Sequence, residues 1–273
     1  MLISAKARWG LRAAALLYLL LLLILPVVIV FTKTFEHGVG TAWSYMTTPA
    51  AISALSLSLL MAIVAVPLNA IFGIGAALII VRGRHRRLAA VLDAFIDLPF
   101  LVSPVIVGLA LTLVYGIHGW FGAWLASHGV QIIFAPTGMI IATVFVSLPF
   151  VVREVAPVLA EVGDEQEQAA ATLGACGWQT FRRITLPSIR WGVLYGVILS
   201  TARALGEIGA VLVVSSLVAG STLTLPLLVY ERTQNPGSAG VTGAYAAATE
   251  LAVISLVVLL AMTLLSPRRT RST

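Results

Sequence analysis

The residues with the most unusual chemical setting in this 273-residue sequence are Arg203 and Glu207, which lie inside a long apolar stretch. A charged side chain at the centre of an apolar, membrane-type helix costs about 2.5–3.5 kcal/mol. Because the two residues are four positions apart, they share one helix face and can form an ion pair. Three roles are open to them: a structural pair, including one at a contact with a partner chain, a gate or path element, and direct contact of Arg203 with an anionic substrate.

Other reactive side chains do not form a catalytic group in the sequence. Cys176 is the only cysteine, so we expect no intrachain disulfide and no cysteine-based metal cluster. The four histidines lie in separate predicted loops without the spacing of metal ligands. The only lysines, Lys6 and Lys33, do not follow a glycine-rich phosphate loop, which needs a lysine. We therefore predict no catalytic residue, metal, phosphate-binding loop or cofactor on this chain.

Three more acidic residues lie in or near apolar stretches. Asp93 and Asp97 are four positions apart near the start of one stretch, and we expect them to meet basic loop residues rather than a substrate. Glu250 leaves two interpretations open, contact with a transport path and contact with another helix.

The composition indicates an integral membrane protein. Apolar residues make up 59% of the chain and charged residues only 10%, whereas a soluble domain has about 25% charged residues. Such a chain lacks the charge to cover a water-facing surface. The net charge of +6 does not indicate a nucleic-acid ligand, because the basic residues lie between apolar runs and not on one face.

Six apolar runs are long enough to be membrane spans, since about 20 mostly apolar residues cross the hydrocarbon core. They form a single transmembrane domain, residues 1–273, with spans at about 11–31, 54–81, 92–115, 137–152, 189–217 and 243–265. With both termini in the cytoplasm, 14 Lys or Arg residues lie inside and only Lys33 and Arg232 lie outside. The excess of positive charge on cytoplasmic loops favours this orientation and an even number of spans.

The longest polar stretch, residues 153–188, separates the fourth and fifth spans. Strong helix formers run from Asp164 to Leu173, and the two glycines that follow, Gly174 and Gly177, are expected to end that helix. A second short helix is predicted from Trp178 to about Thr185, before Pro187 stops it. Its apolar side has nothing to pack on within such a small element, so a partner must cover it.

This stretch, from Gln168 to Pro187, resembles the cytoplasmic EAA loop of permease subunits of bacterial ABC importers. The family pattern is Glu-Ala-Ala, three residues, Gly, nine residues, Ile, any residue, Leu-Pro. The matching positions here are Ala169, Ala170, Gly174, Ile184, Leu186 and Pro187, with Gln168 in place of the usual Glu. The resemblance implies a type I ABC importer fold and a loop that docks on a separate ATPase subunit.

Three stretches, 96–111, 202–216 and 222–231, are similar to sulfate and thiosulfate permeases, and the Ser103-Pro104 pair to their CysW type. Molybdate permeases share part of this pattern. Pro99 and Pro104 interrupt the third span, so this break either presents helix amide groups to an anion or is a packing kink. Ser103, Arg203 and Glu207 are further candidates for the translocation path or gate.

The resemblance also implies partners and a location. The partners are a second, CysT-like permease, two ATPase subunits that bind ATP and Mg, an external sulfate-binding protein and membrane lipid. The location is the bacterial plasma membrane. The main alternative is a permease for molybdate or another oxyanion. A less favoured one is an ion-driven secondary transporter using Glu207 or Glu250, and a membrane-embedded enzyme is disfavoured because no catalytic cluster is present.

Overall fold

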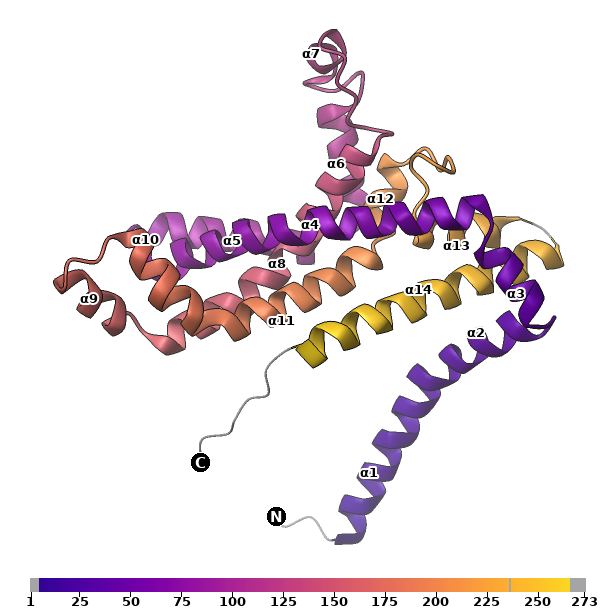
Figure 1. Cartoon of the computed structure of the whole chain (residues 1–273), viewed down its shortest axis with the longest axis horizontal. Coiled ribbons are helices and arrows are strands. Elements are labelled where there is room, and N and C mark those ends of the chain that lie inside the picture. The colour runs from indigo at the N-terminus through magenta and orange to yellow at the C-terminus, as the bar shows by residue number, and fades with distance from the viewer. Residues whose placement is uncertain (1–4, 236, 266–273) are drawn as a thin grey trace.

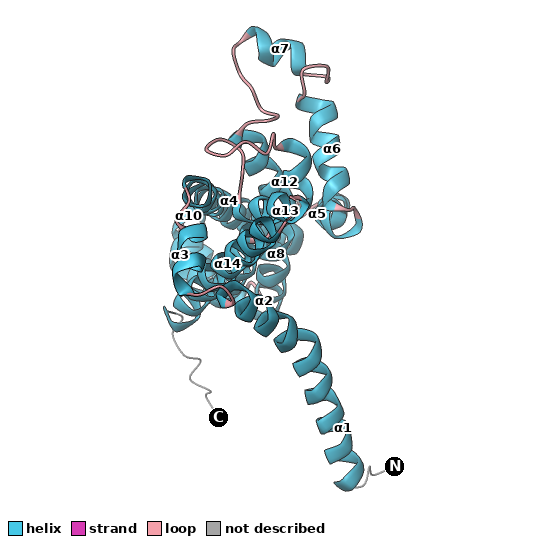
Figure 2. Cartoon of the chain, turned by 90° about the vertical axis from the view of Figure 1, so that its right-hand side faces the viewer, coloured by secondary structure: helices cyan, strands magenta, loops and turns pink. Residues whose placement is uncertain are grey.

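The computed structural model describes residues 5–235 and 237–265, and all regular structure in these ranges is helical (Figures 1 and 2). The predicted all-α class is confirmed. Of the basic residues used to predict the orientation, Arg268, Arg269 and Arg271 lie outside the described residues, and the side chains of Lys6 and Arg8 are not described either.

Three long helices form the centre of the molecule: α4 (Pro49–Arg82), α8 (Pro136–Val162) and α11 (Leu186–Leu205). They run side by side along the long axis of Figure 1, with α14 (Ser238–Leu265) beside them. Glycines let these helices approach closely. A Cβ atom added to Gly73 would lie 2.7 Å from Cγ1 of Val151, and one added to Gly196 would lie 2.8 Å from Cα of Val151.

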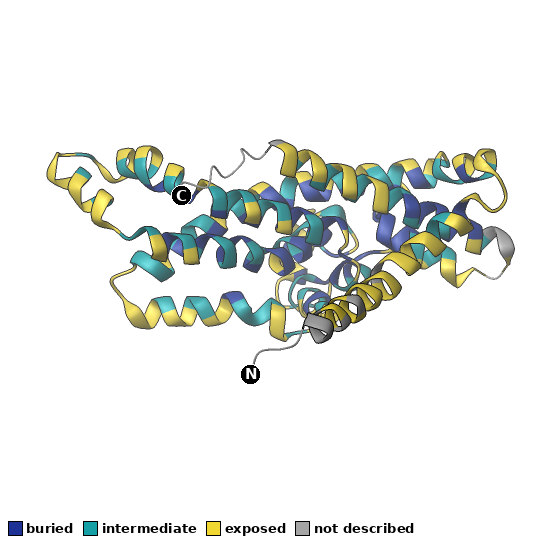
Figure 3. Cartoon of the chain, turned by 90° about the horizontal axis from the view of Figure 1, so that it is seen from below, coloured by how far each residue is buried: buried dark blue, intermediate teal, exposed yellow. Residues whose placement is uncertain are grey.

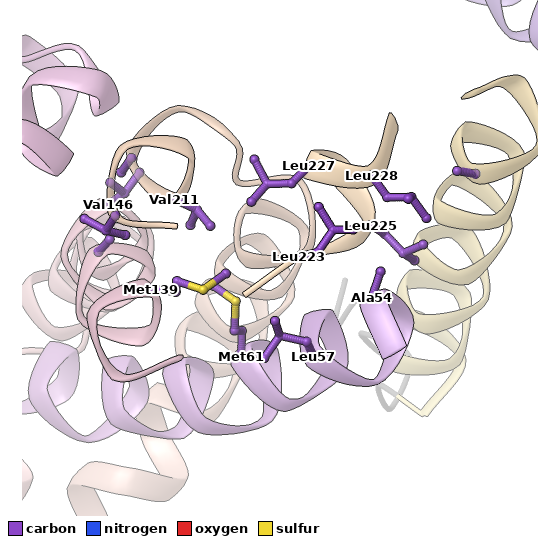
Figure 4. Close-up of a cluster of buried hydrophobic side chains, with 14 of the residues drawn as sticks. Ala54, Leu57, Met61, Met139, Val146, Val211, Leu223, Leu225, Leu227 and Leu228 are labelled. Carbon is purple, nitrogen blue, oxygen red and sulfur yellow. The ribbon is translucent and has the colours of Figure 1, made fainter. Parts of the chain in front are cut away.

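Of the three hydrophobic clusters in the described bundle, the two larger ones contain most of the buried apolar side chains. One lies between α4, α8 and α11 and includes the fully buried Val151, Val155 and Ile189. The other joins α4 and α8 to the segments after α11, where Met61 and Met139 lie close to Leu223 (Figure 4). Many large apolar side chains remain exposed, as expected of a lipid-facing surface. Exposed residues lie along the outer faces of the helices (Figure 3).

Within the described residues, four helices are long and apolar enough to cross a membrane, and a bent pair makes a fifth if it counts as one span. The four correspond to the first, second, fourth and sixth predicted spans and cover Ala14–Phe35, Pro49–Arg82, Pro136–Val162 and Gly240–Leu264. The third predicted span is the bent pair, α5 (Arg86–Leu101) and α6 (Pro104–Tyr115), with an angle of 112° between its halves. The fifth is also divided, because α11 ends at Leu205 and α12 (Gly209–Val214) follows after a break.

The N-terminal helical segment extends away from the bundle (Figures 1 and 2). It consists of α1 (Ala5–Leu19), the π-helical turn η1 (Leu20–Ile24) and α2 (Leu25–Phe35). Near its end, the buried hydroxyls of Thr34 and Thr249 share a hydrogen bond of 2.7 Å that joins α2 to α14. Most of its remaining described side chains are exposed, so this helix is available to lipid or to another chain.

Shorter helices connect the long ones: α3 (Val39–Met46), α7 (Gly122–Ser127) and α13 (Leu225–Gln234). Together, α6 and α7 project from the side of the bundle (Figure 2). Arg232 on α13 donates hydrogen bonds to the carbonyl of Gly243 (2.8 Å) and to Oγ1 of Thr48 (3.0 Å). Burial lowers the pKa of the Arg232 guanidinium, but an arginine still stays charged and ties α13 to α4 and α14.

Candidate coupling loop and broken spans

The segment between α8 and α11, residues 163–185, is called the coupling loop below. The predicted polar stretch began at residue 153, but α8 continues as a helix to Val162. Residues 153–162 belong to the bundle because Val155 and Leu159 are fully buried in its core. The coupling loop lies at the end of the bundle where α9 (Glu165–Thr172) and α10 (Gly177–Thr180) are labelled in Figure 1.

Gly174 ends α9, as predicted, through a specific backbone geometry. Its φ of +82° is in the left-handed region, which favours glycine. The Gly174 N–H donates to the Ala171 carbonyl and the Ala175 N–H donates to the Ala170 carbonyl, both at 3.0 Å. These two bonds form a Schellman motif, which closes a helix end with a fixed reversal. The prediction that Gly177 also ends this helix is wrong, because Gly177 is the first residue of α10.

Pro187 does not stop the second short helix, contrary to the prediction. Instead, α10 runs into a π-helical turn, η2 (Phe181–Thr185), which continues directly into α11. In this turn the Leu186 N–H donates to the Phe181 carbonyl, five residues back. The wider turn relieves the clash that a proline ring makes in a regular α-helix. The same arrangement precedes Pro26, where the Leu25 N–H donates to the Leu20 carbonyl.

The outer surface of the coupling loop carries apolar side chains without a cover. Leu173 is 88% exposed and Trp178 is 68% exposed. The Trp178 ring stacks on Phe181 with 5.6 Å between centroids. The two aromatic side chains of this exposed apolar surface are therefore already arranged before a partner binds. The family-pattern residues divide into two sets: Gln168, Ala169, Gly174 and Pro187 are exposed, whereas Ala170, Ile184 and Leu186 are half-buried.

Glu167 fixes the coupling loop to the bundle, a role that the sequence did not reveal. Its Oε2 accepts a hydrogen bond from Nε of Arg82 at 3.2 Å, and its Oε1 accepts one from Oγ1 of Thr185 at 2.8 Å. Arg82 also donates to the carbonyls of Leu159 and Gly163. One carboxylate therefore connects α9 with the end of α4 and with η2. One indication of this role was present in the sequence: Glu167 is the neighbour of Gln168, and the family pattern has a glutamate at the position of Gln168.

Arg153 on α8 bridges both acidic residues of α5. Its Nη1 lies 2.9 Å from Oδ1 of Asp93, its Nη2 lies 2.6 Å from Oδ2 of Asp97, and its Nε donates to Oδ1 of Asp97 at 3.0 Å. The expectation that these acids meet a basic residue is confirmed. The partner belongs to a helix rather than to a loop, so the contact fixes α5 against α8.

The break in the third span lies at Val102 and Ser103, between the two prolines. Pro104 begins α6, as expected of a proline in the first helical turn. Pro99 does not interrupt the helix, contrary to the prediction, because α5 continues to Leu101. After the bend, α6 packs on α12. A Cβ atom added to Gly108 would lie 2.6 Å from the Ala210 carbonyl oxygen, so this contact needs a glycine.

Arg203 and Glu207 form the predicted ion pair, with 2.6 Å between Nη1 and Oε2. The Glu207 side chain is 1% exposed and that of Arg203 is 28% exposed. The other carboxylate oxygen of Glu207 accepts a hydrogen bond from the Ala210 N–H at 2.8 Å. Glu207 thus stabilises the start of α12 after the break at Gly206.

A buried polar cluster joins the three central helices. Asn69 is fully buried, and its Nδ2 donates to Oγ of Ser147 (2.7 Å) and to Oγ of Ser200 (3.2 Å). The Oδ1 atom of Asn69 is buried without a hydrogen-bond partner in the described structure. Sequence reasoning missed this cluster, although an amide inside an apolar span was the available signal. Glu250 likewise has one buried oxygen without a hydrogen-bond partner in the described structure.

The described side chains do not bring together three or more His, Cys, Asp or Glu residues in a way that would hold a metal ion. The candidate site consists of exposed apolar side chains on the coupling loop, which Glu167 fixes to the bundle, and of two broken spans that meet at Gly108.

Comparison with known proteins identifies the family. Residues 69–271 match the model of the family described as binding-protein-dependent transport system inner membrane component. The chain belongs to this family. The permease is 49% identical over 252 residues to the sulfate transport system permease protein CysW of Synechocystis sp.. The matched region covers 92% of the permease and 91% of that relative. Its identity to the CysW protein of Escherichia coli K12 is 42% over 253 residues, covering 91% of the permease and 85% of the relative.

The solved structures show the same fold. A chain of a bacterial alginate ABC transporter, crystallised with a periplasmic protein that carries an alginate pentasaccharide, matches with a TM-score of 0.80. The match covers 97% of the permease and 96% of that chain at 19% sequence identity, so it bears on the fold alone. The family resemblance inferred from the sequence is confirmed: the protein is a multi-pass, all-helical ABC importer permease.

Proposed function

We propose that this permease is the membrane subunit of an ATP-driven importer of sulfate and thiosulfate. The observation that supports the substrate most directly is the identity of 42–49% with proteins named as sulfate transport permeases, over more than nine-tenths of the chain. Each broken pair, α5 with α6 and α11 with α12, counts as one span in this proposal. The permease then has six spans, and both termini lie in the cytoplasm of a bacterial plasma membrane.

The coupling loop supports the proposed mechanism because it is built as a rigid element. The Schellman motif at Gly174 fixes the angle between its helices, and Glu167 fixes α9 to α4 and η2. A separate ATPase subunit that covers Leu173 and Trp178 can push on this element, and the continuous helix from η2 into α11 passes the displacement to the break at Gly206. A flexible loop would absorb such a displacement.

The path or gate is proposed to lie where the two broken spans meet. Ser103 and Pro104 at the start of α6 lie close to α12, since a Cβ atom added to Gly209 would be 2.9 Å from Cβ of Pro104. Arg203 is the partly exposed cation near this junction, and Glu207 holds it in place. Pro99 stays within the same proposal as a helical residue just before the bend. A partly exposed arginine is suited to an oxyanion that passes it.

The complete importer in this proposal has four further parts. They are a second, CysT-like permease, two ATPase subunits that bind ATP and Mg, and an external sulfate-binding protein. A CysT protein of Synechocystis sp. is 37% identical to this permease over a region that covers 92% of the permease. The two permease types therefore share one fold and can form a pseudosymmetric pair. No nucleotide or other cofactor is proposed to bind this chain.

Reconstitution tests the function. The permease, a CysT-like permease and the ATPase are placed in proteoliposomes with the binding protein outside, and uptake of labelled sulfate is measured with and without internal ATP. We expect ATP-dependent uptake that excess thiosulfate inhibits and excess molybdate does not. Strong inhibition by molybdate would favour the other oxyanion permease. Sulfate uptake by the permease alone, driven by a proton gradient without ATP, would favour a secondary transporter.

A further inference from the structure

The segment that links α4 to α5 carries a dense group of exposed cations. Arg84, His85, Arg86 and Arg87 are consecutive, and all four are exposed. No ion pair or side-chain hydrogen bond to the three arginines occurs among the described residues. Arg82, two residues earlier, differs because Glu167 and two carbonyl groups accept its hydrogen bonds. The three arginines after it thus have no acid to neutralise them in the part of the chain that the structure describes.

An apolar stripe begins next to these cations. Leu88, Val91 and Phe95 on α5 are 57%, 51% and 62% exposed. Their spacing of three and four residues places them on one helix face. The opposite face of α5 packs on the bundle, where Ile96 is 4% exposed and both acids bind Arg153. The acids of α5 are therefore turned away from the stripe and already paired.

The position of this surface relates it to the membrane. The apolar helix α4, a candidate span, ends at Arg82, so the arginines lie where a span leaves the hydrocarbon core. A lipid presents a phosphate at this level and acyl chains directly beside it. Basic clusters next to the end of a span attract anionic lipid, and each cation near such a surface contributes measurably.

We propose that Arg84, Arg86 and Arg87, together with the stripe Leu88, Val91 and Phe95, form a binding surface for an anionic phospholipid. The arginines hold the phosphate and the stripe lies along an acyl chain. A free oxyanion fits less well, because the apolar side chains beside the arginines have no hydrogen-bond donor or charge with which to bind it. The surface adjoins Arg82, which binds the coupling loop through Glu167, so a bound lipid holds this end of α4 in place whatever solute is transported.

Native mass spectrometry of the full chain in detergent tests the proposal. Phosphatidylglycerol and phosphatidylcholine of equal chain length are titrated in parallel. We expect the wild type to bind phosphatidylglycerol more tightly, and R84Q/R87Q to lose about fivefold in affinity for each arginine removed. The matched control is R12Q/R190Q, which removes two exposed arginines that each lie over a tryptophan ring; it should retain the wild-type preference.

A second variant separates a lipid from a free anion. L88S/V91S should weaken phosphatidylglycerol binding and leave the binding of glycerol phosphate unchanged. Equal losses in R84Q/R87Q and R12Q/R190Q would overturn the proposal in favour of general attraction to positive charge. Competition by glycerol phosphate or sulfate as effective as that by phosphatidylglycerol would also overturn it. So would loss of the lipid preference when the ATPase subunits are bound, because the cluster would then be an ATPase contact.

Discussion

Removing Arg203 should destabilise the permease because Glu207 would be left charged and buried. The Glu207 side chain is 1% exposed, and its only cationic contact in the described structure is Arg203 at 2.6 Å. Truncation of one partner of a buried ion pair typically costs about 3–5 kcal/mol. Since the Arg203 side chain is 28% exposed, water already screens part of the pair, and we expect Arg203→Ala to cost about 3 kcal/mol. That corresponds to a change of roughly 100-fold in the ratio of folded to unfolded protein.

The double variant R203A/E207Q gives the sharper test. A glutamine at position 207 keeps an oxygen that can accept the Ala210 N–H but carries no charge. The double variant should therefore be more stable than R203A alone by about 2 kcal/mol, because the unpaired buried charge is gone. Simple additivity of two independent losses would instead make it less stable than R203A.

Equilibrium unfolding in mixed micelles, followed by tryptophan fluorescence, measures these differences, and ATP-dependent sulfate uptake is measured in parallel. If the pair is only structural, R203A/E207Q regains both stability and uptake. If Arg203 belongs to the path, the variant regains stability while uptake stays low. A wild-type stability for R203A, or a double variant no more stable than R203A, would refute the argument from burial.

Three other changes test the coupling loop and the bundle. Gly174→Ala should lower the free energy of unfolding by about 1–2 kcal/mol, because an L residue is strained at a φ of +82°. It should also lower the amount of sulfate taken up per ATP hydrolysed. The matched control is Gly177→Ala, since Gly177 also lies in open space but has no positive φ. Glu167→Ala should reduce uptake more than hydrolysis, whereas the exposed Glu165→Ala should leave both unchanged; equal effects would contradict the bracing role. Asn69→Ala removes two buried hydrogen bonds and should lower the free energy of unfolding by about 1–3 kcal/mol, measured by the same unfolding assay; no change would show that the amide is not stabilising.

Several local predictions were confirmed because they depend on nearby residues alone. Gly174 ends α9 since a glycine after a run of helix formers can take a left-handed backbone. Arg203 and Glu207 pair since a helix brings residues four apart onto one face. The roles of Gln168, Ala169 and Ala170 in contacting an ATPase remain predictions, because they concern a partner chain.

The predictions about helix ends were less accurate where the backbone had more than one way to satisfy its hydrogen bonds. Pro187 was expected to stop a helix, but the π-helical turn before it lets the chain continue into α11. The fifth span was predicted as one stretch at about 189–217, but the helix breaks at Gly206, and Glu207 provides an acceptor for the Ala210 N–H. Both outcomes depend on geometry that residue composition does not specify.

The amino-acid sequence by itself determined that this is a helical membrane protein of the ABC-permease family, because lipid requires long apolar helices and the family's loop pattern is local. Only the tertiary structure decided which distant residues support that loop and the bundle. Glu167 binds Arg82, 85 positions away, and Asn69 binds Ser147 and Ser200, 78 and 131 positions away. The physical reason is that a polar side chain in an apolar bundle takes its partner from whichever helix packs beside it, and helix packing is a property of the whole chain.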